Sequence, residues 1–286
     1  MVNIDVPDIH YERPLERIGI NSVGLKNVKT PPLRNDRYWL YPAFHILVSL
    51  PPHMRGIHVS RLYESLVEYI QPGMEIGIDV LEKIAIKILE RNEYTSKAIV
   101  YMRAYVMRQD MDKRGFPYYS GDDLVYIKII MARDRGLVRR DLGIGLYTPI
   151  ACPCALATAG HVFGKPYTHM NKAWLKLIIS SNTLAVFPTL FLHDLDNILR
   201  PVNLLKKMDE ALMVKKIVEN PMFLEDLVRR AVCILVHKYI DKLRGDDTII
   251  AKAHSIEPLH EYQLKAFLRG KISELIGGCR VEMANT

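Results

Sequence analysis

The sequence has no apolar run long enough to cross a membrane, and no secretory signal is visible in its first residues. A membrane helix needs about 18 consecutive apolar residues. The two most apolar stretches, at 38–52 and 184–195, are shorter, and both contain proline and histidine. The first residues contain acidic side chains and no apolar core, unlike a secretory signal. We therefore expect a cytoplasmic protein with no membrane partner.

Cysteine and glutamine are also scarce. Four cysteines in 286 residues do not indicate a disulfide scaffold. Few glutamines beside many isoleucines, lysines and arginines favour a hot-growing source. The net charge of +7 suggests an anionic partner. Nucleic acid, a membrane surface and a phosphorylated small molecule are the candidates. Lysine and arginine are scattered rather than gathered in one arm, which argues against a nucleic-acid arm, and an exposed, solvated surface explains most of the charge.

Hydrophobic periodicity predicts a doubled pattern along the chain. The first half has two alternating strands, two helices and two further strands. The strands are expected at 17–32, 37–52, 96–110 and 122–134, and the helices at 58–70 and 79–92. The second half restarts near residue 136 with strands at 136–151, 172–190 and 247–255 and helices at 204–219 and 221–243. We therefore predict an α+β protein of two modules, 1–136 and 137–286, each an antiparallel sheet with helices on one face.

A short segment, "PIACPCALATAGHVFGKPYTHM" at 149–170, holds Cys152, Cys154 and His169. Thiolate and imidazole groups are common metal ligands, and strand ends followed by loops could aim them into a cleft. The CxC spacing alone is weak evidence for a metal site, and the alternative is two buried structural cysteines. Glu210 and Glu225 begin helices, where an acidic residue is often a solvated first-turn charge. If Glu225 points into a pocket, its carboxylate could instead accept two N–H groups from a purine.

Two further stretches could carry polar chemistry. "HSIEPLHEY" contains Glu257 and His260, a carboxylate and an imidazole suited to proton transfer near neutral pH. "RGIHVSRL" places Arg55, His58 and Arg61 where a strand meets a helix, an arrangement that suits an anion. The alternative for the first stretch is surface or core residues whose hydrogen bonds are already satisfied. The alternative for the second stretch is an ordinary helix start.

Together these stretches resemble one family, the GTP cyclohydrolases of type IB and the archaeal MptA type. The matching segments occur in the family's order and span most of the chain. They are "RIGINSVGLKNVKTP" at 17–31, "RGIHVSRL" at 55–62, "CPC" at 152–154, "THM" at 168–170, "DE" at 209–210, "ENPMFLEDLVR" at 219–229 and "EPLH" at 257–260. The resemblance implies a tandem tunnelling fold of two ββααββ modules. It also implies a homo-oligomer, a tetramer, with active sites between subunits.

The resemblance also implies roles for individual residues. It implies that Cys152, His169 and Glu210 bind one divalent metal per subunit, with Fe(II) favoured, although Zn(II) and Mn(II) also suit the mixed ligand set. It implies that Glu225 anchors the purine. His260, Glu257 and Cys154 would serve catalysis, and Arg55, His58, Arg61 and Lys172 would bind the triphosphate of GTP.

The implied activity converts GTP to 7,8-dihydroneopterin 2',3'-cyclic phosphate with release of formate, in archaeal pterin (methanopterin-type) biosynthesis. Asn171 and Lys172 stand where Gln-Arg is expected, and Tyr262 stands where many members have a second histidine. A type IB product, 7,8-dihydroneopterin triphosphate for folate biosynthesis, and an inactive family member are therefore alternatives. A basic nucleic-acid-binding module with structural Cys and His residues is the alternative of another class.

Overall fold

The computed structural model describes residues 8–111, 117–199 and 206–279, which form two compact units. The first unit contains residues 8–36, 40–104 and 127–140, and the second contains most of the remainder. Strands β4 (Lys97–Met111), β5 (Pro117–Ala132) and β6 (Gly136–Ala151) are long enough to contribute residues to both units. The units therefore interleave along the chain, and the two modules divided at residue 136 stay a prediction.

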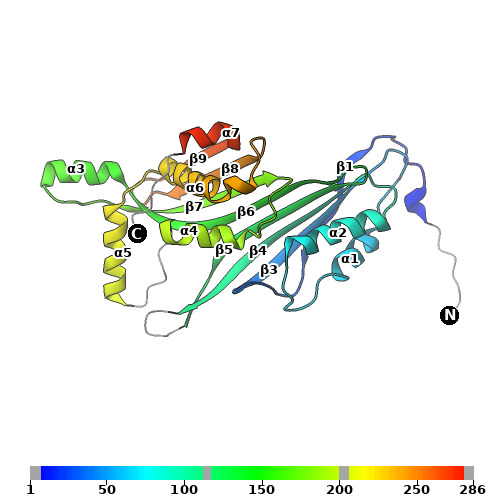
Figure 1. Cartoon of the computed structure of the whole chain (residues 1–286), viewed down its shortest axis with the longest axis horizontal. Helices are drawn as coiled ribbons and strands as arrows, with labels where there is room; N and C mark the ends of the chain where they lie inside the picture. Colours follow the sequence, from blue (N-terminus) through cyan, green and yellow to red (C-terminus); the bar gives the residue numbers. More distant parts are fainter. Residues whose placement is uncertain (1–7, 112–116, 200–205, 280–286) are drawn as a thin grey trace. The chain divides into compact units, whose positions relative to one another are not determined.

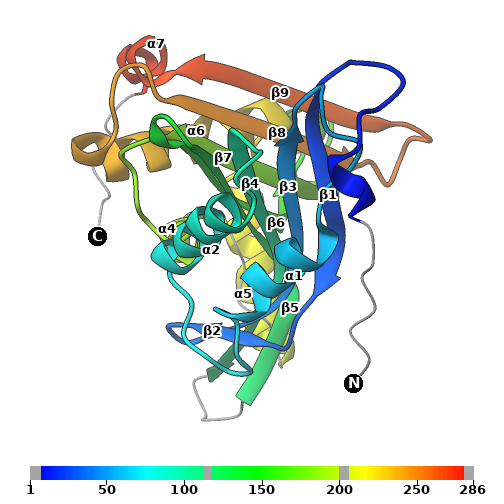
Figure 2. The ribbon, with the colours of Figure 1, turned by 90° about the vertical axis from the view of Figure 1, so that its right-hand side faces the viewer.

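The first unit is a mostly antiparallel sheet covered by two helices. Its strand order is β1 (Ile20–Lys29), β3 (Tyr38–Leu50), β4, β5 and β6, with β2 (Leu33–Asn35) beside β3. Alternate residues of β3 are buried, as expected for a strand with one face toward the core. Helices α1 (Val59–Val67) and α2 (Ile78–Arg91) cover one face of this sheet (Figure 2). Their buried residues recur at helical spacing, so the predicted elements of this half are confirmed.

The second unit continues with β7 (Met170–Ser181), β8 (Thr248–Ile256) and β9 (Gln263–Lys271) in the order β6-β7-β8-β9. Helix α6 (Leu224–Tyr239) lies along these strands, and α4 (Thr189–Leu199) packs beside it (Figure 1). Helices α3 (Pro153–Phe163) and α5 (Lys207–Glu219) bury little or nothing. The remaining elements are α7 (Ile272–Leu275) and the 3-10 turns η1 (Ile9–Tyr11), η2 (Ile240–Lys242) and η3 (Ile276–Gly278). In the described ranges, no helix is both long and apolar enough to cross a membrane.

Two predictions for the second unit were wrong in detail, and one strand was missed. The strand expected at 172–190 ends at Ser181, and helix α4 begins at Thr189. The cysteine segment, expected as loop, forms α3 after Cys152. Strand β9 did not appear among the predicted elements. The start of the helix expected at 204–219 lies outside the described residues, and α5 begins at Lys207.

A disulfide joins Cys233 of α6 to Cys279, which follows η3. The other two cysteines, Cys152 and Cys154, are free thiols. The bond ties the last described turn of the chain to the core helix of the second unit. It leaves the CxC pair available for chemistry.

Candidate active site

Cys152 lies where β6 ends and α3 begins, with Pro153 in the first turn of the helix. Its backbone N–H donates to the carbonyl oxygen of His169 at 3.1 Å. The N–H of Ala155 donates to its sulfur at 3.5 Å. The thiol is half-buried. Two of the three predicted metal ligands therefore come from adjacent segments of backbone, and the sulfur is free to bind an ion.

A hydrogen-bonded array runs from His169 into the sheet. Antiparallel pairing of β7 with β8 sets Lys172 opposite Ile256, so Asn171 and Glu257 face each other one step further along. The Asn171 Nδ2 group donates to both carboxylate oxygens of Glu257 at 2.7 Å. Ser255 donates to one of those oxygens at 2.5 Å. Asn171 and Glu257 are each only 7% exposed, so the carboxylate is satisfied away from water.

The same array fixes how His169 can act. Nδ1 of His169 lies 2.9 Å from Oδ1 of Asn171. Because Nδ2 of Asn171 already faces a carboxylate, Oδ1 must accept, and Nδ1 of His169 must carry the proton. Nε2 of the neutral ring then carries the lone pair and is the nitrogen able to bind a metal ion. Histidine ligands are commonly oriented through their other ring nitrogen in this way. Asn171, which departs from the family pattern, thus links the predicted ligand to a buried carboxylate.

The predicted purine anchor, Glu225, begins α6 close to this region. The N–H of Met222, just before the helix, donates to the carbonyl oxygen of Ala151 at 3.2 Å, next to Cys152. Glu225 lies in the first turn of α6, and Glu210 lies in the first turn of α5. Both are exposed, and neither carboxylate has a hydrogen bond or ion pair within the described part of the chain. Both acids are therefore available to a ligand.

The other predicted residues of the second unit lie at its surface. Lys172 is exposed, with Nζ 4.4 Å from the centroid of the Tyr147 ring. The exposed ring of His260 stacks on Tyr262, with centroids 4.8 Å apart. Cys154 is exposed in the first turn of α3. The residue at the second departure, Tyr262, therefore supports the ring of the predicted proton-transfer histidine.

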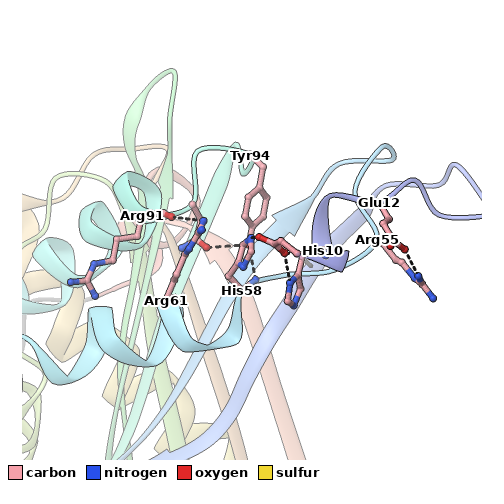
Figure 3. Close-up of polar contacts among 9 residues, drawn as sticks. His10, Glu12, Arg55, His58, Arg61, Arg91 and Tyr94 are labelled. Carbon is pink, nitrogen blue, oxygen red and sulfur yellow. Dashed lines mark hydrogen bonds and ion pairs between the residues drawn. The ribbon is translucent and has the colours of Figure 1, made fainter. Parts of the chain in front are cut away.

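Of the four residues predicted to bind the triphosphate, Arg55, His58 and Arg61 belong to the first unit and Lys172 belongs to the second. Arg55 is exposed and forms an ion pair with Glu12 at 2.5 Å. Arg61 donates to the carbonyl oxygen of Arg91 at 3.3 Å. Figure 3 shows Arg61, His58 and Arg55 along the start of α1 and the loop before it. The cluster of Arg55, His58 and Arg61 and the region around Cys152 therefore belong to different units.

His58 is buried at the start of α1, with only 8% of its surface exposed. Its backbone N–H donates to the hydroxyl of Tyr94 at 3.4 Å. Burial lowers the pKa of His58, the positive charge of Arg61 lowers it further, and Asp8 acts in the opposite direction. The hydrogen bond from His10 lowers the pKa of the Asp8 carboxyl. A neutral imidazole therefore faces a carboxylate at this point.

The structure brings some predicted ligands together and not others. Cys152 and His169 are joined through their backbones. Within one chain, however, Cys152, His169 and Glu210 do not bring their ligand atoms within 4.8 Å of one another. Among the described residues, one set of three His, Cys, Asp or Glu side chains does meet that distance. That set is Asp8, His10 and His58, of which the sequence analysis named only His58.

Comparison with known families identifies the family to which this chain belongs. The family model for type I GTP cyclohydrolase folE2 matches residues 6–266. This chain belongs to the type I GTP cyclohydrolase family. As a member of that family it is an enzyme that acts on GTP. The resemblance inferred from seven short segments is confirmed, and the match covers both units.

Curated relatives extend over nearly the whole of this cyclohydrolase. GTP cyclohydrolase MptA 1 of Methanocella arvoryzae is 26% identical over 304 aligned residues, covering 95% of this chain and 96% of the relative. GTP cyclohydrolase MptA of Thermoplasma acidophilum is 25% identical, with 95% and 98% covered. The Pyrococcus furiosus MptA is 27% identical, with 88% and 93% covered. The chain therefore spans nearly the whole length of each of these relatives.

Among solved structures, a uricase from Bacillus fastidious matches with a TM-score of 0.51. It covers 93% of this cyclohydrolase and 97% of the uricase, at 10% sequence identity. At that identity the similarity concerns the fold alone. It confirms the predicted α+β tunnelling fold, with a mostly antiparallel sheet and helices on one face.

Proposed function

We propose that this chain converts GTP to 7,8-dihydroneopterin 2',3'-cyclic phosphate with release of formate and diphosphate, in archaeal pterin (methanopterin-type) biosynthesis. The family acts on GTP, and the relatives named above carry the name GTP cyclohydrolase MptA. The observation that carries the proposal is the array in which Asn171 holds His169 beside Cys152. It supplies a free thiol and an oriented imidazole at one point of the second unit.

We propose that these two groups hold a divalent ion, with Fe(II) favoured over Zn(II) and Mn(II). Thiol, imidazole and carboxylate form a donor set that leaves an open position, as catalytic metal sites do. When bound, such an ion makes hydroxide available near neutral pH by lowering the pKa of a coordinated water. Glu210 is the proposed third ligand. Its carboxylate is exposed on α5 and must come from a shifted α5 or from a second subunit.

The remaining roles follow from the chemistry of each side chain. Glu225, with a free carboxylate at the start of α6, accepts two N–H groups from the guanine edge, as a charge-assisted pair. His260 and Cys154 are exposed and can move protons at the reacting ring. Glu257 is tied to Asn171 and Ser255, so we propose that it positions His169 through Asn171. Arg55, His58, Arg61 and Lys172 are the proposed triphosphate ligands.

We also propose a homo-oligomer, a tetramer, with active sites between subunits. Strands β1 and β9 each end the strand order of their unit, and an unpaired strand edge invites pairing with another chain. Exposed apolar side chains lie on β9, Leu264 and Phe267 among them. Light scattering on the eluted protein should give four times 32.9 kDa, about 132 kDa. A mass of one chain under turnover conditions would contradict the shared site.

Turnover under anaerobic conditions tests the activity. Metal-free protein is incubated with GTP and Fe(II), Mn(II) or Zn(II) in turn, formate is measured, and the pterin is identified by mass. The cyclic phosphate keeps one phosphorus atom of three, whereas a type IB product keeps all three, so the masses separate the two reactions. Absence of formate with every ion would contradict the proposal. Salt-sensitive retention of RNA or DNA in its place would favour the nucleic-acid-binding alternative.

Matched variants test the site within the same assay. Cys152→Ala and His169→Ala should lose bound metal and formate release together. His161→Ala is the control, because His161 is an exposed histidine in the last turn of α3 and has no assigned role. Its metal content and turnover should remain those of the wild type. Normal turnover by the Cys152→Ala variant would contradict the ligand assignment.

A further inference from the structure

The region before β1 contains a histidine and an aspartate that come together with a buried histidine from α1. Nδ1 of His10 lies 2.8 Å from Oδ1 of Asp8. Nε2 of His58 lies 3.7 Å from Oδ2 of the same carboxylate. The two imidazole rings have their centroids 4.5 Å apart. One carboxylate thus faces two imidazoles that come from separate parts of the sequence.

The nitrogen of His58 that faces Asp8 has no hydrogen-bond partner among the described residues. The ring is nine-tenths buried, and aromatic rings of Tyr11 and Tyr94 lie beside it. A buried imidazole nitrogen without a partner is costly. An ion between this nitrogen and the carboxylate would satisfy both. Figure 3 shows the rings of His10 and His58 turned toward each other below Tyr94.

The distances suit a small divalent cation. Ligand atoms held at about 2.1 Å from a first-row ion are separated from one another by roughly 3 to 3.5 Å. The two contacts to the Asp8 carboxylate, 2.8 Å and 3.7 Å, bracket that range. All three ligand atoms lie within 4.8 Å of one another. Shifts of roughly 1 Å in these side chains would therefore bring the three ligand atoms to the separations that a bound ion requires.

One side of this cluster is open to water. The side chains of Asp8 and His10 are 44% and 40% exposed, whereas that of His58 is 9% exposed. The carboxylate of Glu12, close in the sequence, is paired with Arg55. A single carboxylate leaves a divalent ion with a net positive charge, so its open positions would take water or an anionic oxygen. Two imidazoles and one carboxylate are a donor set for Zn(II), Fe(II), Co(II) or Mn(II).

We propose that Asp8, His10 and His58 form a binding site for a first-row divalent cation, separate from the Cys152 and His169 site. An ion bound at Nε2 of His58 would replace the direct phosphate contact proposed for that residue. The inference is otherwise independent of the proposed Cys152 and His169 site, because these residues belong to the other unit and contain no sulfur. The simpler interpretation is a hydrogen-bonded cluster that holds residues 8–12 against α1 and binds no ion. The two interpretations differ in metal stoichiometry.

The test uses untagged, metal-free Cys152→Ser protein, in which the sulfur-containing site is removed. Titration with Co(II), followed by calorimetry and absorption spectroscopy, should show one ion per chain with ligand-field bands and no sulfur-to-cobalt charge transfer. Adding His10→Gln should weaken that binding by at least about 100-fold, more than is usual for loss of an outer partner. Asp8→Asn keeps an acceptor for His10 but removes the charge, and it should weaken binding similarly.

His53→Gln on the same background is the control, because His53 is an exposed histidine five residues before His58. It should bind Co(II) as the background protein does. Thermal unfolding without metal checks that each variant folds. If the Cys152→Ser protein binds no stoichiometric ion, or if the His10→Gln variant binds as tightly as its background, the site does not exist. In wild-type protein a charge-transfer band reports the sulfur site independently, so failure of either site is seen separately.

Discussion

Replacing Asn171 by leucine should destabilise the second unit, because this side chain is hydrogen-bonded to both His169 and Glu257. Leucine is branched at the same carbon as asparagine but is larger, so the change removes the hydrogen bonds without opening a cavity. Both Asn171 and Glu257 are 7% exposed. Water therefore cannot readily replace the lost donor. The carboxylate would keep only the hydroxyl of Ser255 among its described partners.

The expected size follows from the contacts. Hydrogen bonds to a charged group contribute about 1.5–3 kcal/mol, and the Nδ2 group reaches both Glu257 oxygens at 2.7 Å. With the additional loss of the His169 contact at 2.9 Å, the unfolding free energy should fall by about 2–4 kcal/mol. Metal affinity at His169 should fall by about 10–100-fold, since the ring loses the group that orients it.

A double-mutant cycle with Glu257→Gln measures this directly by denaturant unfolding. The glutamine keeps the shape of the side chain and removes its charge. If Asn171 acts through Glu257, the two changes should be non-additive by about 1–3 kcal/mol. Additive effects within about 0.5 kcal/mol, or an Asn171→Leu protein that unfolds like the wild type, would refute the reasoning.

Two more predictions concern stability. Replacing Cys233 by serine should lower the unfolding free energy by about 4 kcal/mol, the chain-entropy value for cysteines 46 residues apart. Thiol titration in denaturant should find two thiols per chain without reductant and four with it, and four without reductant would rule out the bond. Burial lowers the pKa of His45, and the charges of Lys26 and Arg103 lower it further. The folded state therefore resists protonation of His45. The unfolding free energy should be unaffected by this residue above pH 6.5, the pKa of histidine in the unfolded chain, and should fall as the pH drops below that value. His45→Gln should flatten this fall in urea unfolding between about pH 7.5 and pH 5, and an unchanged slope would argue against the assignment.

The first half of the fold could be predicted because its elements carry strong local patterns. Helix α2 buries residues at 81, 84, 85 and 88, and β3 alternates along its length. In the second half, α3 was missed because it lacks an apolar stripe, with only Ala159 buried. Its first-turn proline and its left-handed Gly164 cap were the available signals. The strand predicted at 172–190 was too long because it included Pro188, although proline is rare inside strands.

The candidate site was partly predictable for similar reasons. Cys152 and His169 stand out by residue type, whereas the role of Asn171 depends on the register that sets β7 against β8. That register cannot be read from one sequence. The cluster around His58 was hidden because Asp8 and His10 lie about 50 residues earlier in the chain. The disulfide was missed because Cys233 and Cys279 carry no spacing motif.

Anomalous diffraction from crystals grown with Zn(II) tests the proposed active site most directly. We expect a zinc peak about 2.3 Å from the sulfur of Cys152 and about 2.1 Å from Nε2 of His169, with Nδ1 of the same ring still bonded to Asn171. If protein that turns over GTP shows no zinc at Cys152, or shows His169 bound through Nδ1, the proposed site is wrong.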